Sequence, residues 1–266
     1  MNKPTQILTG AVLAFALSAC ATTTQMTSGA DYLSHYQPAM STAVSGGTSS
    51  ETDAQVRDIA AVEPDLKFPA RIGLARIEGG RLTNAPAKEM QAWAGLADSL
   101  GAPYGEFVPV SPFIAAMVRP QSDTKDNRYN GGRYNDGNIA PVIADIRRAS
   151  ARQHLDYALV YEVSQNESNK SNGLSFTNLT VLGMFIIPSR NVKIKSAANA
   201  ILIDVRNGYP YGTATAFASD KQARTLASSG SSRQKARANN HLLAVENLTG
   251  EVETMMKDLW VLQHKQ

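Results

Sequence analysis

The chain has 266 residues, of which 43% are hydrophobic and 18% are charged, and its formal net charge is +3. This composition is that of an ordinary globular protein and excludes collagen-like and intrinsically disordered chains. The small net charge does not support nucleic-acid binding, so we expect no nucleic-acid partner. The single Cys excludes an internal disulfide and a paired-Cys metal site.

The first twenty residues have the pattern of an export signal. Lys3 precedes an apolar run from Ile7 to Leu17, which is too short to span a membrane as a stable helix. Leu17-Ser18-Ala19-Cys20 closes the run and resembles the lipobox of bacterial lipoproteins. This resemblance implies cleavage between Ala19 and Cys20, a diacylglycerol thioether on Cys20 and a further acyl chain, such as palmitate, on its amino group.

The lipobox resemblance also implies a location. In such lipoproteins an Asp after the Cys retains the protein in the inner membrane, and this chain has Ala21 there. We therefore expect a lipid anchor in the outer membrane, on its periplasmic face, with surface exposure left open. Several acyl chains bind a bilayer far more firmly than one.

The composition divides the chain into three parts. Residues 1–19 are the signal peptide. Residues 20–53 are rich in Ser, Thr, Gly and Ala, and we interpret them as a lipidated flexible tether, because such a segment buries too little apolar surface to offset its ordering entropy. Residues 54–266 are expected to form a single α/β domain.

Hydrophobic periodicity within 54–266 predicts a layered mixed β-sheet with packed helices, an α/β (α+β) fold. The apolar run 179–187 is interpreted as a buried strand, with membrane insertion or an oligomer contact as the alternative. A β-hairpin is expected at 196–218, with Asn207-Gly208 in a type I′ turn. Helices are predicted at 54–61, 85–100, about 141–150 and about 231–263, and further strands at 70–77, 105–112 and 155–163.

The last predicted helix has an apolar stripe from Val245 to Leu262, in alternating steps of three and four residues. The stripe is under three heptads long and includes Gly250. It therefore favours a helix packed on the sheet over a coiled coil.

Three motifs resemble the rhombotarget lipoproteins: residues 154–162 (HLDYALVYE), 182–189 (LGMFIIPS) and 200–213 (AILIDVRNGYPYGT). That family has no defined activity to carry over. Its Gly-rich C-terminal sorting tail has no counterpart here, so rhomboid-type processing is not expected. More distantly, the order of elements is similar to the N-terminal domain of TolB and to the curli-secretion lipoprotein, a likeness of architecture and not of function.

Motifs for enzymatic chemistry are missing from the sequence. There is no Gly-x-Ser-x-Gly, His-Glu-x-x-His or Gly-x-x-x-x-Gly-Lys, and the four His residues are scattered. Asp156, Glu162 and Asp204 lie on predicted strands, but the sequence does not pair them. We assign no catalytic residue, cofactor or metal, and expect a protein that is not an enzyme.

Two basic clusters are the remaining candidates for binding. Arg233, Lys235 and Arg237 lie near a predicted helix start, where they oppose the helix dipole, and suggest contact with an anionic lipid or an acidic partner. The alternative is a solvated basic segment. A second trio ends the helix near 150 and is either a dipole complement or an anion-binding face: Arg147, Arg148 and Arg152.

The sequence therefore predicts an outer-membrane lipoprotein that binds an envelope partner in assembly, maintenance or surface-related processes. An oligomeric export channel or secretion accessory is the alternative, and an envelope hydrolase is the third reading.

Overall fold

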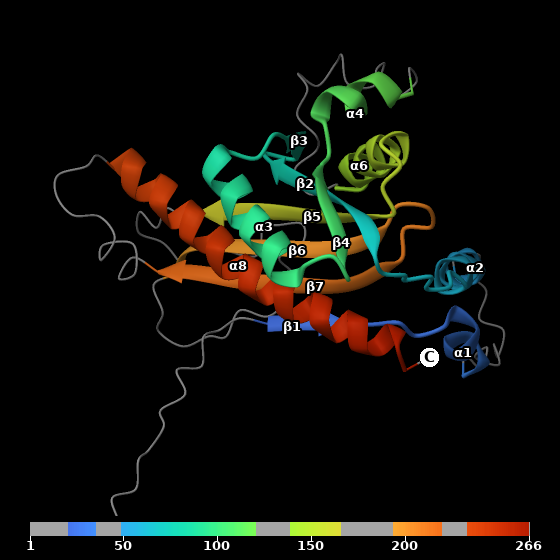
Figure 1. Ribbon diagram of the computed structural model, residues 1–266. Coiled ribbons are helices and arrows are strands. Elements are labelled where there is room, and N and C mark those ends of the chain that lie inside the picture. The colour runs from blue at the N-terminus through green and yellow to red at the C-terminus, as the bar shows by residue number, and fades with distance from the viewer. Residues whose placement is uncertain (1–20, 36–48, 121–138, 166–193, 220–232, 266) are drawn as a thin grey trace, which may run out of the picture.

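A computed structural model of the protein describes residues 21–35, 49–120, 139–165, 194–219 and 233–265. They form a mixed α/β fold in which one sheet carries helices on both faces (Figure 1). The expected fold class is confirmed. The predicted loop 121–138 and the apolar run 179–187 lie outside the described residues.

The described strands form one seven-stranded sheet with the order β1-β7-β6-β5-β2-β3, and β4 also pairs with β2. β2 is parallel to β4 and β5, and the other pairings are antiparallel. The strand bounds are β1 Ala21–Thr24, β2 Ala70–Glu78, β3 Arg81–Thr83, β4 Gly105–Pro109, β5 Tyr157–Gln165, β6 Ile194–Asp204 and β7 Pro210–Ser219.

The long helix α8 (Arg233–Gln263) crosses one face of the sheet beside α3 (Ala87–Leu100) (Figure 1). Its predicted apolar stripe is buried: Val245, Leu248, Val252, Met255 and Leu259 are fully covered. The helix is therefore packed on the sheet, as its short stripe with Gly250 predicts. The other face is covered over β2 and β5 by α6 (Ala140–Arg152), which packs against α4 (Pro112–Val118). α4 was not predicted.

A buried ion pair ties α3 to the sheet. Arg76 Nε lies 2.9 Å from Glu89 Oε2, and Tyr161 donates its hydroxyl to the same oxygen at 2.9 Å. Burial and the neighbouring Glu89 carboxylate raise the pKa of Tyr161. Each charge of the pair is thus compensated by a partner in a site that excludes water.

Regular elements lie within the segment that its composition favours as a tether. Residues 21–24 form the edge strand β1, Gly29–Ser34 form α1, and Ser49–Ala60 form α2, while 36–48 lie outside the described residues. Low hydrophobicity suggested a tether, but β-branched Thr residues suit an edge strand that needs few apolar contacts. The chain is therefore ordered from the residue that follows Cys20.

The predicted hairpin at 196–218 is confirmed, but its turn is not type I′. Gly208 has φ 81°, whereas Asn207 has no positive φ. The turn is longer: the Gly208 amide donates to Asp204 O at 3.0 Å and the Asp204 amide to Tyr209 O at 2.9 Å. The Asp204 side chain accepts from the turn backbone, so a type I′ conformation is not required.

Gly212 on β7 lets β1 and α8 approach the same point of the sheet. A Cβ atom there would lie 2.7 Å from Thr23 O and 2.9 Å from Met255 Sδ. We expect Gly212→Ala to lower the free energy of unfolding by about 1–3 kcal/mol, since the added methyl overpacks a filled site. Urea unfolding of the purified chain measures the change.

The matched control is Gly250→Ala, on the solvent side of α8. A Cβ there meets nothing within 4 Å. This variant should raise the free energy of unfolding by up to about 1 kcal/mol, because Ala is the better helix former. Equal effects of the two substitutions would contradict the close approach at Gly212.

Candidate functional site

The residues after the candidate lipidation site are fixed to the sheet. In the β1–β7 pairing Ala21 lies opposite Thr215 and Thr24 opposite Gly212. The Oγ1 atoms of Thr23 and Thr213 are 2.7 Å apart. The Gln25 amide continues the pairing by donating to Tyr211 O at 2.8 Å. Cys20 directly precedes Ala21, the first residue of β1, in the sequence.

The part of the sheet from the Ala21 row to the last residues of β5 and β7 is here called the anchor end, because β1 begins there. Ala21 pairs with Thr215, which pairs with Asn199, which in turn pairs with Glu162. Asn199 Oδ1 accepts a hydrogen bond from Thr215 at 2.9 Å, whereas the buried Glu162 Oε2 has no hydrogen-bond partner among the residues that the structure describes. Polar side chains of three neighbouring strands thus lie in the row of the residue that follows Cys20.

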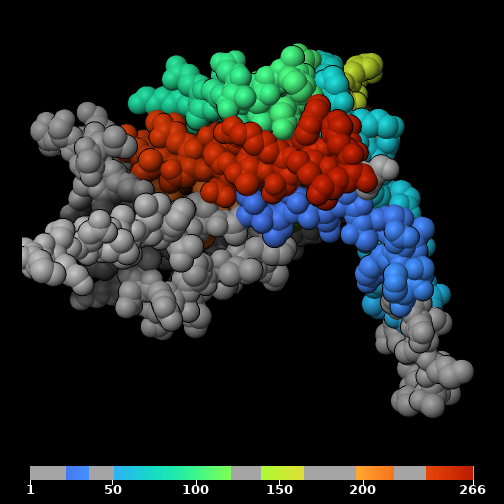
Figure 2. Space-filling model, turned by 60° about the horizontal axis from the view of Figure 1, so that its bottom comes forward, coloured from blue at the N-terminus to red at the C-terminus, as the bar shows by residue number. Residues whose placement is uncertain are grey.

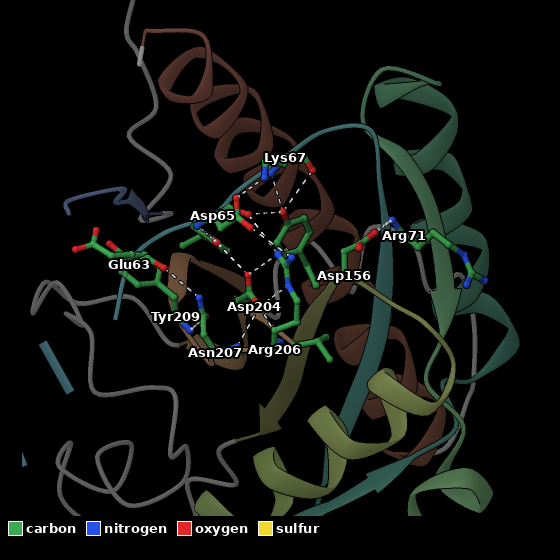
Figure 3. Close-up of polar contacts among 12 residues, drawn as sticks. Glu63, Asp65, Lys67, Arg71, Asp156, Asp204, Arg206, Asn207 and Tyr209 are labelled. Atoms are coloured by element: carbon green, nitrogen blue, oxygen red, sulfur yellow. Dashed lines mark hydrogen bonds and ion pairs between the residues drawn. The ribbon is translucent and has the colours of Figure 1, made fainter. Parts of the chain in front are cut away.

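The opposite end of the sheet, here called the turn end, is built around Asp204 (Figure 3). Asp204 is fully buried at the end of β6. Its Oδ1 accepts from the Arg206 amide at 2.7 Å and the Asn207 amide at 3.2 Å. Its Oδ2 accepts from the Tyr211 hydroxyl and from the Arg206 guanidinium, each at 3.2 Å. Both oxygens of the carboxylate thus accept hydrogen bonds that stabilise the turn.

The Asp204 network extends to the strand-free segment before β2. The Asp65 amide donates to the Tyr211 oxygen at 2.9 Å, and the Lys67 amide donates to the Tyr157 oxygen at 2.7 Å. Tyr157 in turn donates to Asp65 O at 3.0 Å. Burial raises the pKa of Tyr157 to about 12. The tyrosines therefore stay protonated and act as structural donors.

The same turn holds the helices α1 and α2. Asn207 Nδ2 donates to Glu63 O at 3.0 Å, and Tyr209 donates its hydroxyl to Thr27 O at 3.1 Å. Glu63 Oε1 accepts from the Ala30 amide at 2.8 Å and from Ser28 Oγ at 3.2 Å. These hydrogen bonds lower the pKa of Glu63, which is ionised at the start of α1.

The three arginines of α6 do not form one open face. Arg147 donates to the carbonyls of Val205 and Arg206 in the turn, at 3.1 and 2.7 Å. Arg148 pairs with the buried Asp145, which Arg119 also contacts. Arg152 is exposed. Arg147 and Arg148 therefore make contacts that stabilise the fold, and complementing the helix dipole explains only part of their role.

The other basic trio lies elsewhere. Arg233, Lys235 and Arg237 belong to the first turns of α8, but their side chains lie outside the described residues. α8 starts near the anchor end and reaches Phe68 at its last residue, where the Phe68 amide donates to Gln263 Oε1 (Figure 1). The two trios are thus separated, since Arg147 contacts the turn end.

The candidate carboxylates are also divided between the two ends. Asp156 and Asp204 are close, because Asp204 pairs with Tyr157 and the Val205 amide donates to Asp156 O at 3.0 Å. Asp156 Oδ2 accepts from the Arg71 amide at 2.8 Å. Glu162 lies on β5, five residues after Tyr157. In the part of the chain that the structure describes, no three His, Cys, Asp or Glu side chains are grouped to hold a metal ion.

A groove of about 680 Å³ lies between α3 and α8. Gly95 and Gly250 lie in its lining, together with Ser99 and Glu253. Glu253 Oε1 accepts from Ser99 Oγ at 2.8 Å and from Lys257 Nζ at 2.7 Å, so its charge is already paired. The Ser99 hydroxyl thus meets a carboxylate whose charge Lys257 already compensates.

Comparisons with known proteins give little to identify the chain. No protein-family model and no curated protein matches it. One similar solved structure is a dodecamer of a PelC variant from Paraburkholderia phytofirmans, with 14% sequence identity and a TM-score of 0.28. The match covers 70% of this chain and 92% of the PelC chain. No described helix has the length and hydropathy needed to cross a bilayer.

Asp204 could not be recognised as the centre of the turn end from its strand pattern alone. We expect Asp204→Asn to lower the free energy of unfolding by about 1.5–3 kcal/mol, because it removes charge-assisted hydrogen bonds in a buried site. Urea unfolding measures the loss. Asp98→Asn on the exposed face of α3 is the control and should stay within about 0.5 kcal/mol. A similar loss in both variants would contradict the role of Asp204.

Burial raises the pKa of Glu162 to about 7, well above its ordinary value of 4.5. The folded chain therefore holds this proton between pH 4.5 and 7, where the unfolded chain releases it. The contribution of Glu162 to stability should fall as pH rises through this window and stay constant above it. Comparing pH profiles of unfolding for the natural chain and Glu162→Gln should reveal a difference of on the order of 1–3 kcal/mol. Parallel profiles would contradict the shift.

Proposed function

We propose that the protein is a lipid-anchored accessory of the bacterial cell envelope that acts by binding another envelope component. The observation that carries the proposal is the position of the lipobox Cys20 directly before β1. Because β1 is hydrogen-bonded to β7, acylation of Cys20 would attach the sheet itself to the membrane. A membrane-bound fold without a long tether holds its far end at a set height above the bilayer.

The expected height of the turn end above the bilayer follows from the length of the extended segment after Cys20. Residues 21–27 run along β7 from the Ala21 row to the turn end, where Tyr209 contacts Thr27. At about 3.3 Å per residue, this length is about 23 Å. The turn end would thus stand roughly this far from the anchor when the strand is upright. A binding protein gains from such a fixed distance, because less orientational freedom is lost on binding.

Acylation and location are tested together in a Gram-negative host. The natural chain should incorporate an alkynyl palmitate analogue and fractionate with the outer membrane. A form with a conventional secretory signal and Cys20→Ala should take up no label and appear in the soluble periplasmic fraction. The reason is that no other described segment is long and apolar enough to hold it in a bilayer as a helix.

Ala21→Asp is the matched control for location. It keeps Cys20 and should keep the label, but the sorting rule of such lipoproteins places it in the inner membrane. Membrane attachment of the Cys20→Ala form, or an unlabelled natural chain, would contradict the proposed anchor. Crosslinking of the natural chain then separates the two modes of action: a distinct envelope partner supports the binding role, and self-crosslinked species alone support an oligomeric export accessory.

A further inference from the structure

The helices α1 and α2 form an exposed projection at the turn end, here called the α1–α2 projection. Figure 2 shows α1 extending from the body of the molecule, beyond the last residues of α8. Every side chain from Glu51 to Ile59 is exposed. α2 thus has almost no packing partner in the described chain, although a helix of 12 residues is marginal alone in water.

Apolar side chains are displayed on this projection. Ile59 is 75% exposed, Tyr32 is 52% exposed and Val56 is 38% exposed. Val56 and Ile59 are three residues apart and therefore share a face of α2. Such a row of apolar residues on an amphipathic helix is the usual means by which a helix enters an apolar groove of another protein.

The base of the projection is rigid. A Cβ atom on Gly29 would lie 2.3 Å from Ala60 O, so the start of α1 and the end of α2 are in direct contact. Glu63 holds the first turn of α1, and Asn207 holds the Glu63 carbonyl. The Asp204 network thus presents the two helices in a fixed position, instead of leaving them free to fold back on the sheet.

The projection is acidic in a chain that is basic as a whole. Between Gly29 and Glu63 the chain has five carboxylates and one guanidinium, whereas the formal net charge of the whole chain is +3. The carboxylates are Asp31, Glu51, Asp53, Asp58 and Glu63, and the cation is Arg57. A partner surface with Lys or Arg around an apolar centre would be complementary to this arrangement.

We propose that the α1–α2 projection is the docking surface for another envelope protein, whose site is an apolar groove with a basic rim. This inference rests on the proposed function and adds the surface and the chemistry of the partner. A bilayer is a poor occupant, because the projection is acidic and lies at the end of β1 opposite Cys20. A symmetric contact with a second copy would bring two acidic surfaces together.

The test places the photoreactive amino acid p-benzoylphenylalanine at position 59 of the full lipidated chain in living cells. The matched control places it at position 113, because Phe113 on α4 is also 75% exposed. Irradiation should give an adduct with one envelope protein at position 59, with a yield at least fivefold above position 113. Mass spectrometry should locate the crosslink at an apolar residue flanked by Lys or Arg.

Charge is tested in the same cells by adding Asp53→Asn and Asp58→Asn. The adduct at position 59 should fall at least threefold, because both carboxylates lie on the exposed helix. Thermal unfolding of the purified double variant checks that it folds as the natural chain does. An adduct with a second copy, with lipid or with an acidic surface would overturn the inference, as would no adduct above the control or an adduct unaffected by neutralisation.

The result for the docking surface can be distinguished from the result for the lipid anchor. Fractionation of the same cells reports whether the chain is in the outer membrane. An anchored chain without the adduct contradicts only the docking surface. A chain that forms the adduct but is not membrane-bound contradicts only the proposed anchor.

Discussion

The pairing of β1 with β7 is the contact on which the proposed relation between fold and membrane depends. It makes the residues after the lipobox-like motif the edge of the sheet instead of a linker. The pairing requires Gly212, because Thr23 O and Met255 Sδ both approach the place where a Cβ would lie. The edge strand β1 is short and polar, and both properties disfavour its pairing with other chains.

The two ends of the sheet differ in how they use polar groups. At the turn end, the buried Asp204 carboxylate has a donor for each oxygen, and the tyrosines around it are donors and acceptors at once. At the anchor end, the buried Glu162 Oε2 has no hydrogen-bond partner within the described part of the chain. A satisfied network makes a rigid site, whereas an unsatisfied carboxyl becomes neutral more easily. The turn end is therefore the better platform for presenting a binding surface.

Sequence patterns predicted the elements that bury apolar side chains. β2 is buried on both faces and the stripe that begins at Val245 is buried against the sheet, so both elements are visible in the sequence as apolar patterns. β1 and α4 were missed because the first buries little and the second is a short helix that exposes Phe113 and Met117. The turn was misread because Asn-Gly is a local signal, while the conformation follows from Asp204 accepting from the next amides, a known property of Asp in turns.

The candidate site was harder to predict than the fold, because its parts are far apart in the chain. Asn207 reaches Glu63 and Tyr209 reaches Thr27 only because β6 and β7 pair and the segment before β2 crosses their end. The lipobox, in contrast, is a contiguous motif and needs no fold to be recognised. A residue such as Arg147 looks like a surface cation in the sequence, yet it donates to two turn carbonyls.

The arrangement of the two ends also limits what the exposed helix can do. If α1 and α2 were attached through a flexible segment, Ile59 and Val56 could fold back on the nearest apolar surface of the same chain. The Gly29–Ala60 contact and the Glu63 hydrogen bonds prevent this, because they fix the helices beyond the turn. The exposure of these apolar side chains is therefore imposed by the fold. A fold that maintains such exposure at a cost in solvation is best explained by a partner that covers it.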